Sequence, residues 1–564
     1  MEPVINSLKV FHVEASGLSV SLSLFFIFLA LLYWYSVFPY SVLSRCGIKH
    51  PKPSPFLGNT LLFRQGCLDP LIDLIKTYGR VCGYYMGREP VVLVADPDIV
   101  RQVMVKEFSS FPNRTCKKTL MLSTKPLRDS LLALRDEQWK KIRGMFTPSF
   151  SAAKMKEMVP LINTAIDSLM NNLNAYAESG EAFDIHRCFN CFTMDVTASV
   201  AFGTQLDSQK NPNHPFVHHA KMFMSFNLIK PIMLIFIAFP SILAPLLAFL
   251  PKKRQPNNFF ISSIKKIIKQ RDEQPPEQRR RDFLQLMLDA RSSQECVSVE
   301  HFDMVNHADE LDHTHQQAPE PASEKDNGNN HPWVSPTKRP QKTMLTEDEI
   351  VGQAFVFFLA GYDTSSNMLA FTCYLMAIHP ECQRKVQEEV DQFIARHESP
   401  DYTTVQELKY LDMVISEVLR LYPTAFRFGR HIDHDCVVNG LFLPKGALLQ
   451  VPTCFLHQDP EHWPEPERFI PERFTPEAKA NRHPFVYLPF GAGPRNCVGM
   501  RLAQMERKMV LVHVLQRFNI VACSETKVPL EVESWNTLGP KNGVFVKLTR
   551  RDLGKDQVNS PPDD

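Results

Sequence analysis

Phe490-Gly-Ala-Gly-Pro-Arg-Asn-Cys-Val-Gly499 is the stretch that decides the fold of this chain. Its single cysteine, Cys497, stands two residues after Arg495 and just before an apolar, helix-forming run. Glycines such as Gly493 carry no Cβ, so the backbone can turn tightly and approach a flat ligand. The positive end of a following helix stabilises a thiolate. The stretch predicts a cysteine ligand for haem iron and an arginine for a haem propionate. The alternative is a glycine-rich turn around a buried structural cysteine.

The complete pattern resembles the haem-binding signature of the cytochrome P-450 family, Phe-x-x-Gly-x-Arg-x-Cys-x-Gly, at every fixed position. This resemblance, which extends over nearly the whole chain, implies a mainly α-helical fold with small β-sheets. It implies one haem b (iron protoporphyrin IX), with Cys497 as the axial ligand of the iron. Phe490, Gly493 and Arg495 would be further haem-binding residues.

The composition indicates one large enzyme at a membrane. The 564 residues contain no internal repeat, and a net charge of +2 gives no reason to expect nucleic acid as a partner. The 13 cysteines are an odd number and are scattered along the chain. With a thiolate that must stay reduced, they favour the cytosolic side of a membrane over a disulfide scaffold. Cys188-Phe-Asn-Cys191 has no second pair, so we interpret it as two packing cysteines rather than a zinc or redox site.

An apolar N-terminal segment predicts a membrane anchor. Residues 15–44 contain no charge, and Leu18–Phe38 matches the roughly 20 residues that a helix needs to cross a bilayer. More basic residues follow this segment than precede it, which places the remainder in the cytosol. A cleaved signal peptide is the alternative, but the segment is too long and no small-residue cleavage site closes it. We expect a single-pass anchor at 1–45 and a catalytic domain at 46–564, on the endoplasmic reticulum membrane.

Two internal segments depart from the pattern of a compact domain. The apolar stretch at 222–254 is interrupted by prolines and ends in Lys252-Lys-Arg254, which predicts short helices that dip into the membrane surface. A buried helical hairpin is the alternative. By resemblance, this stretch would roof the substrate channel. Residues 301–344 are rich in His, Pro, Asn, Glu and Lys, and predict a disordered insert rather than a metal site.

The glycosylation sequon at Asn113 would be a chance match in a cytosolic domain.

A long helix is expected after Thr346-Glu-Asp-Glu349, which has the pattern of a capping box. This helix contains Ala360-Gly-Tyr-Asp-Thr364, where two small residues precede an acid and an alcohol. A ligand could therefore lie against the backbone while Asp363 and Thr364 handle protons. The motif resembles the family's I-helix sequence, in which the acid and threonine relay protons to iron-bound oxygen. We therefore count Asp363 and Thr364, with Cys497, as candidate catalytic residues.

Glu417 and Arg420 are one helical turn apart, so their side chains can pair. Pro471-Glu-Arg-Phe474 contributes a second arginine, Arg473. By resemblance, Glu417, Arg420 and Arg473 form a structural network that braces the haem-binding core.

Three more residues are assigned by resemblance alone. Trp139 and Arg143 lie on one face of a predicted helix, as in the family's C helix, where both reach a haem propionate. Arg430 follows the Glu417 helix, where the family commonly places another propionate ligand.

Several stretches, among them His50–Phe56, Ala425–Phe428 and Leu538–Val544, resemble a branch of the family that rearranges a lipid peroxide. The implied function is a haem-thiolate isomerase that converts prostaglandin H2 to thromboxane A2, by homolysis of the endoperoxide O–O bond at ferric iron. Isomerases of this kind need no proton relay, yet Thr364 is present. The alternative is therefore a monooxygenase of steroids, fatty acids or xenobiotics, which would need an NADPH-cytochrome reductase as partner. A haem-based sensor or carrier is the third hypothesis.

Overall fold

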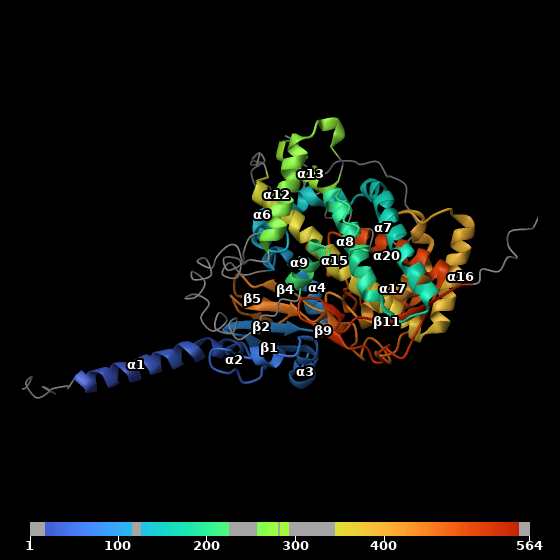
Figure 1. Cartoon of the computed structure of the whole chain (residues 1–564). Helices are drawn as coiled ribbons and strands as arrows, with labels where there is room; N and C mark the ends of the chain where they lie inside the picture. Colours follow the sequence, from blue (N-terminus) through green and yellow to red (C-terminus); the bar gives the residue numbers. More distant parts are fainter. Residues whose placement is uncertain are drawn as a thin grey trace, which may run out of the picture.

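The computed structural model describes residues 17–114, 126–211, 213–224, 257–279, 282–292 and 345–551. These residues form a mainly helical body with small β-sheets (Figure 1), as the sequence predicts. The helices are α1 (Gly17–Val37), α2 (Val42–Arg45), α3 (Leu68–Tyr78), α4 (Pro97–Arg101), α6 (Asp136–Phe146), α7 (Ala152–Ser179), α8 (Ile185–Phe202), α9 (Pro215–Met224), α12 (Asn257–Glu273), α13 (Phe283–Ser292), α15 (Glu347–Ile378), α16 (Pro380–Arg396), α17 (Lys409–Leu421), α18 (Thr453–Leu456), α19 (Pro476–Ala480) and α20 (Met500–Arg517). The strands are β1 (Val81–Met86), β2 (Glu89–Val94), β3 (Phe183–Asp184), β4 (Phe428–His431), β5 (Cys436–Val438), β6 (Leu441–Leu443), β7 (Leu448–Val451), β8 (Phe518–Val521), β9 (Val532–Ser534), β10 (Leu538–Pro540) and β11 (Phe545–Arg550).

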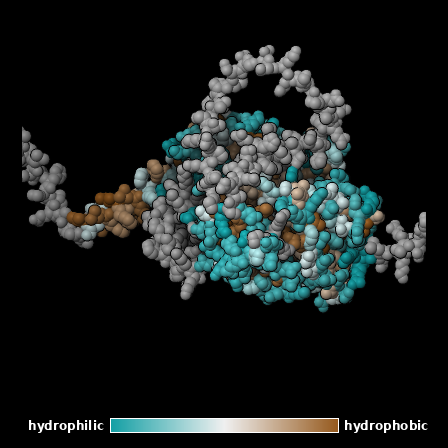
Figure 2. Space-filling model, turned by 90° about the horizontal axis from the view of Figure 1, so that it is seen from above, coloured by the Kyte–Doolittle hydropathy of each residue, from teal (hydrophilic) through white to brown (hydrophobic). Residues whose placement is uncertain are grey.

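Helix α1 projects from the body as a separate apolar rod (Figures 1 and 2). Its large side chains stay exposed, with Phe26 at 64% and Leu24 at 61%. Within the described residues, the helical stretch Val20–Arg45 is long and apolar enough to cross a membrane. Only 6% of the residues in its 18-residue apolar part are buried. Apolar side chains exposed on every side of a helix are stable in lipid rather than in water. The structure therefore agrees with the expected transmembrane helix.

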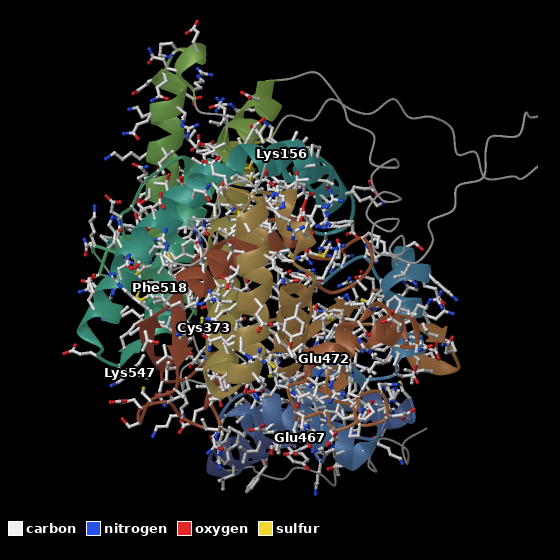
Figure 3. All side chains as sticks on the ribbon, turned by 90° about the vertical axis from the view of Figure 1, so that its right-hand side faces the viewer. Lys156, Cys373, Glu467, Glu472, Phe518 and Lys547 are labelled. Atoms are coloured by element: carbon white, nitrogen blue, oxygen red, sulfur yellow. The ribbon has the colours of Figure 1, made fainter. Side chains whose placement is uncertain are left out.

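Helix α15 runs through the middle of the body and packs against α8, α12 and α17. Its first turn has the predicted capping box, because Thr346 and Glu349 bond reciprocally to each other's backbone N–H groups. Most of its later residues are fully buried, including Cys373, which Figure 3 labels in the interior of the molecule. A helix that is apolar on nearly all sides is a core element, so α15 gives the site a fixed wall.

The largest sheet lies beside α2 and α3 and has the strand order β1-β2-β7-β4. Strands β1 and β2 form an antiparallel pair, and β7 pairs in parallel with β2. Strand β4 is antiparallel to β7 and places Arg430 opposite Leu449. A second sheet, β3-β11-β8, packs on α7, and β9 and β10 form a separate hairpin.

Two predicted segments lie outside the described residues. All of the segment 301–344 lies outside them. Of the segment 222–254, only residues 222–224 are described. The division into an anchor at 1–45 and a catalytic domain at 46–564 stays a prediction.

Candidate active site

Cys497 lies on a tight loop that ends where α20 begins. The loop is closed by two backbone hydrogen bonds of 2.9 Å, from the N–H of Cys497 to the Phe490 carbonyl and from the N–H of Asn496 to the Gly493 carbonyl. Gly493 has a φ of 71°, and a Cβ there would lie 1.9 Å from the Met104 carbonyl oxygen. Glycine is required here because any side chain would strain the loop and collide with the 102–106 segment.

The Cys497 thiol is exposed, whereas the other cysteines of the described residues are buried or half-buried, and none of them forms a disulfide. It stands just before the first residue of α20, Met500. The alternative of a buried structural cysteine is therefore wrong. Cys188 and Cys191, in contrast, are buried, and burial raises the pKa of the Cys191 thiol to about 11. They are packing cysteines, as predicted.

Three arginines, Arg114, Arg430 and Arg495, lie close to one another near this loop; Arg430 and Arg495 are buried and Arg114 is half-buried. Burial and the neighbouring charges of Arg114 and Arg430 lower the pKa of Arg495 to about 8. Burial and Arg114 lower the pKa of Arg430 to about 9. The Nε atoms of all three side chains and Nη1 of Arg495 are buried without a hydrogen-bond partner. Buried cations that repel one another are stabilised by an anion, so we expect this cluster to bind acidic groups.

Trp139 and Arg143 lie on α6, as the expected helix requires, and both side chains contact residues of the cysteine loop. The Arg495 guanidinium lies over the Trp139 ring, 4.2 Å from its centroid. Arg143 donates hydrogen bonds to the backbone oxygen of Asn496 at 3.0 Å and to its side-chain oxygen at 2.7 Å. Arg143 therefore holds the loop just before Cys497. The contacts of both residues with a propionate stay a prediction.

The Ala360–Thr364 segment of α15 carries an accessible strip in an otherwise buried helix. Ala360 is exposed and Thr364 is half-buried, and the Thr364 hydroxyl donates to the Ala360 carbonyl at 2.7 Å. Gly361 faces another way, since a Cβ there would lie 3.0 Å from the Thr197 hydroxyl oxygen on α8. The small residue expected to widen the ligand notch thus serves helix packing instead.

The Asp363 side chain is engaged by two neighbours. Its Oδ2 accepts hydrogen bonds from the Thr537 hydroxyl and, at 3.2 Å, from the Asn367 amide. Burial raises the pKa of the Asp363 carboxyl. This acid is bonded within the protein rather than directed at the accessible strip. Its role in proton transfer stays a prediction.

The Glu417 network has the predicted partners. Glu417 and Arg420 are both fully buried and form a two-point ion pair at 2.7 and 2.8 Å, while Arg473 lies 3.4 Å from Glu417. Arg420 also donates to the backbone oxygen of His457 at 3.0 Å. The His457 Nε2 accepts the N–H of Leu488 at 2.7 Å, just before the cysteine loop begins. The ion pair is thereby connected to the loop that carries Cys497.

Sequence reasoning missed Arg114, Asn367, Thr537 and His457. Arg114 lies within the sequon at Asn113, whose amide is fully buried and bonded to Asp136 and Asp433. The available signal for Arg114 was a charged residue inside a sequon that the expected cytosolic location would leave unmodified.

These residues fit a haem. The described residues offer one exposed thiol at a helix N-terminus, a cluster of arginines whose buried Nε atoms have no hydrogen-bond partner, and an accessible strip on a rigid helix. A haem needs an axial ligand, which a cysteine thiolate can supply, partners for two propionates and room on the opposite face. Arg114, Arg430 and Arg495 would hold the propionates and Cys497 the iron.

Comparison with known proteins agrees with this fit. The sequence model of the cytochrome P450 family matches residues 48–312 and 304–548. The chain is 48% identical to thromboxane-A synthase from Macaca fascicularis over 97% of this chain and 100% of that protein. It is 47% identical to thromboxane-A synthase from Mus musculus, over 95% of this chain and 98% of that protein. Identity to cytochrome P450 3A9 from Rattus norvegicus is 37%, over 93% of this chain and 95% of that protein.

Proposed function

Because the chain belongs to the cytochrome P450 family, we propose that it is a haem-thiolate isomerase that converts prostaglandin H2 to thromboxane A2. The observation that carries this proposal is the gap in identity between two groups of relatives. Identity is 46–48% to the thromboxane-A synthases and 36–37% to the cytochromes P450 of the 3A group, over comparable lengths. The substrate would be a lipophilic endoperoxide.

The residues around Cys497 would hold the cofactor in one orientation. A bound haem supplies an iron that can bind an oxygen atom of a peroxide and weaken its O–O bond. Cys497 would donate a thiolate to the iron, while Arg143 fixes Asn496 and so the approach of that thiolate. The Arg114, Arg430 and Arg495 cluster would neutralise the propionates. The strip from Ala360 to Thr364 would form the wall on the substrate side.

The hydrogen bonds on α15 support an isomerase. The isomerisation breaks the O–O bond and one ring C–C bond and forms two new C–O bonds within one molecule, so it needs no reductant and no net proton. The Thr364 hydroxyl already donates to the Ala360 carbonyl, and the Asp363 carboxylate is held by Thr537 and Asn367. Neither group is poised to deliver a proton to the substrate.

One observation favours the second candidate, a reductase-dependent monooxygenase of lipophilic substrates. The acid and alcohol pair of a proton relay is complete in sequence, at Asp363 and Thr364. A change in the rotamers of these two side chains would free both for that role.

We place the enzyme on the endoplasmic reticulum membrane, with α1 as its anchor and the body in the cytosol. The exposed apolar surface of α1 and the basic residues that follow it support this orientation. Flotation with microsomes and protection of the body from added protease would test it. Protease resistance of the body in sealed microsomes would contradict a cytosolic orientation.

Incubation of the purified ferric protein with prostaglandin H2, without NADPH or reductase, tests the proposed activity. Formation of thromboxane B2, the hydrolysis product of thromboxane A2, is the expected result. Turnover of other lipids only when NADPH and reductase are added would select the monooxygenase. Failure of both reactions in protein with full haem content would favour a sensor or carrier.

A further inference from the structure

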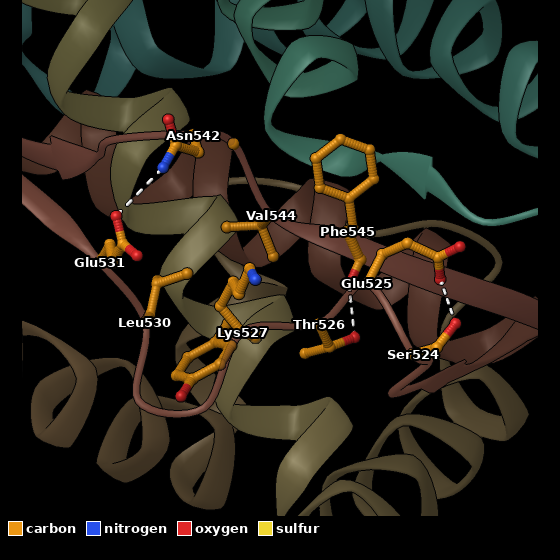
Figure 4. A pocket seen from close by; sticks show the side chains of 11 residues that line it. Ser524, Glu525, Thr526, Lys527, Leu530, Glu531, Asn542, Val544 and Phe545 are labelled. Carbon is orange, nitrogen blue, oxygen red and sulfur yellow. Dashed lines mark hydrogen bonds between the residues drawn. The ribbon is translucent and has the colours of Figure 1, made fainter.

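The β9–β10 hairpin places its tip, residues 535–537, against the centre of α15. The base of the hairpin closes on itself, where the Asn542 amide donates to Glu531 Oε2 at 3.1 Å beside a surface pocket (Figure 4). The tip lies between Ser534 and Leu538, which pair with each other, and it also bonds to other elements. The Asn536 amide donates to the Met224 carbonyl at the end of α9, at 2.9 Å, and the Thr537 hydroxyl donates to Asp363 on α15.

We infer that Asp363 is a positioning residue, which clamps the tip of the β9–β10 hairpin so that the hairpin and the accessible strip of α15 form one rigid substrate wall. Asp363 is adjacent in sequence to Thr364, whose side chain belongs to that strip. A shift of the hairpin tip would therefore change the space beside the strip. The inference rests on the proposed function in one respect: the bound lipid must lie against this wall.

The clamp is a chain of hydrogen bonds between three segments that are far apart in sequence. The His186 Nε2 on α8 donates to the Asn367 Oδ1 at 2.8 Å. The Asn367 amide nitrogen then donates to Asp363 Oδ2 and to the Leu538 carbonyl, both at 3.2 Å. These bonds fix the orientation of the Asn367 amide. Its nitrogen must face the Leu538 carbonyl, which can only accept, and its oxygen faces His186.

Close packing reinforces the clamp. A Cβ at Gly539 on β10 would lie 2.9 Å from the Asn367 amide nitrogen, so the strand passes directly over this side chain. Asn367 itself is 2% exposed. A buried polar chain that is fully bonded holds its members in one arrangement, because any movement leaves a group without a partner.

The chemistry of the clamp separates it from a proton relay. Asp363 uses one oxygen atom, Oδ2, as the acceptor for both Thr537 and Asn367. The carbonyl oxygen of an asparagine can accept the same two bonds but cannot release a proton. Asp363→Asn therefore keeps the clamp and removes the acid, whereas Asp363→Ala removes both.

The experiment compares Asp363→Asn, Asp363→Ala, Thr537→Val and Thr537→Ser with the parent protein, each at equal haem content. Hydrogen exchange of the 532–540 peptide measures the clamp directly. Spectral titration with a stable prostaglandin analogue, in which the peroxide is replaced by a carbon–oxygen bridge, measures substrate positioning. Turnover of prostaglandin H2 is measured in parallel as kcat and KM.

We expect Asp363→Asn and Thr537→Ser to keep parental exchange and analogue affinity. Asp363→Ala and Thr537→Val should exchange faster in 532–540 and bind the analogue about tenfold more weakly, as expected for a lost hydrogen bond to a charged group. Loss of turnover in Asp363→Asn with parental exchange would overturn the inference in favour of a proton relay. Parental exchange and affinity in Thr537→Val would also overturn it. Failure of the proposed function would appear separately, as absence of prostaglandin H2 turnover in the parent protein, with the exchange measurements unaffected.

Discussion

Removal of the Glu417 carboxylate should destabilise the protein more than any exposed charge substitution. Glu417 accepts two hydrogen bonds from Arg420, at 2.7 and 2.8 Å, and one from the N–H of Ile470 at 2.9 Å. Both members of the pair are 0% exposed. In Glu417→Ala, Arg420 would keep its backbone acceptors but lose its counter-charge, and the Ile470 N–H would lose its partner.

The magnitude follows from the burial of the pair. Removing one partner of a buried ion pair costs about 3–5 kcal/mol, because the other charge is left without compensation. An unfolding entropy of about 2.1 cal/mol/K per residue gives about 1.2 kcal/mol/K for a chain of 564 residues that unfolds as one unit. We therefore expect Glu417→Ala to lower Tm by about 3–4 °C. Part of the haem-thiolate signal should also be lost, since Arg420 is connected through His457 to the cysteine loop.

Thermal unfolding followed by circular dichroism, with the carbon monoxide difference spectrum of each sample, is the assay. Glu388→Ala is the matched control, because Glu388 pairs with Arg384 on a helix at 2.6 Å while both side chains are more than half exposed. Such surface pairs contribute less than about 1 kcal/mol, so the control should shift Tm by less than about 1 °C. Equal Tm values for the two variants would refute the argument that burial makes the Glu417 pair structurally decisive.

Three further substitutions test other parts of the site. Cys497→Ser should abolish the reduced, carbon monoxide-bound band near ~450 nm, which requires a thiolate ligand, and a surviving band would exclude Cys497 as the ligand. Thr364→Ala should leave prostaglandin H2 turnover nearly unchanged, whereas a hundredfold loss at constant haem content, in the range of ~10²–10⁴ typical of acid–base catalysis, would indicate proton delivery. Burial lowers the pKa of His457 from 6.5 to about 3, so stability that is complete above pH 6.5 should fall as the pH drops toward 3, because the unfolded chain binds the proton first. Tm measured from pH 7.5 to 5 should fall less steeply in His457→Gln than in the parent, and parallel curves would contradict this origin of the acid sensitivity.

The parts of the site that the sequence predicts are those encoded in short contiguous stretches. The loop around Cys497, the capping box at Thr346 and the Glu417–Arg420 pair each depend on residues within one or two turns of one another. Local geometry constrains such residues directly. The fold could be predicted for the same reason, because several short stretches resemble one family in order and spacing.

The contacts of Asp363 could not be predicted in this way. Its partner Thr537 is 174 residues away in sequence, and only the packing of the hairpin on α15 brings them together. Gly361 gives the same lesson, because its missing side chain accommodates Thr197 from another helix rather than a ligand. Tertiary packing decides which neighbour a small or polar side chain faces. The sequence of its own segment does not contain that information.

The crowding of Arg114, Arg430 and Arg495 links the survival of newly made protein to the supply of its cofactor. Arg430 and Arg495 are buried beside the half-buried Arg114, so their mutual repulsion would lower the stability of the folded chain until the two haem carboxylates neutralise them. Binding to the folded state alone then raises stability in proportion to the logarithm of the free cofactor concentration. Chains made when haem is scarce would spend more time unfolded and be degraded sooner. The amount of enzyme in a cell would thus follow haem synthesis without any dedicated regulator.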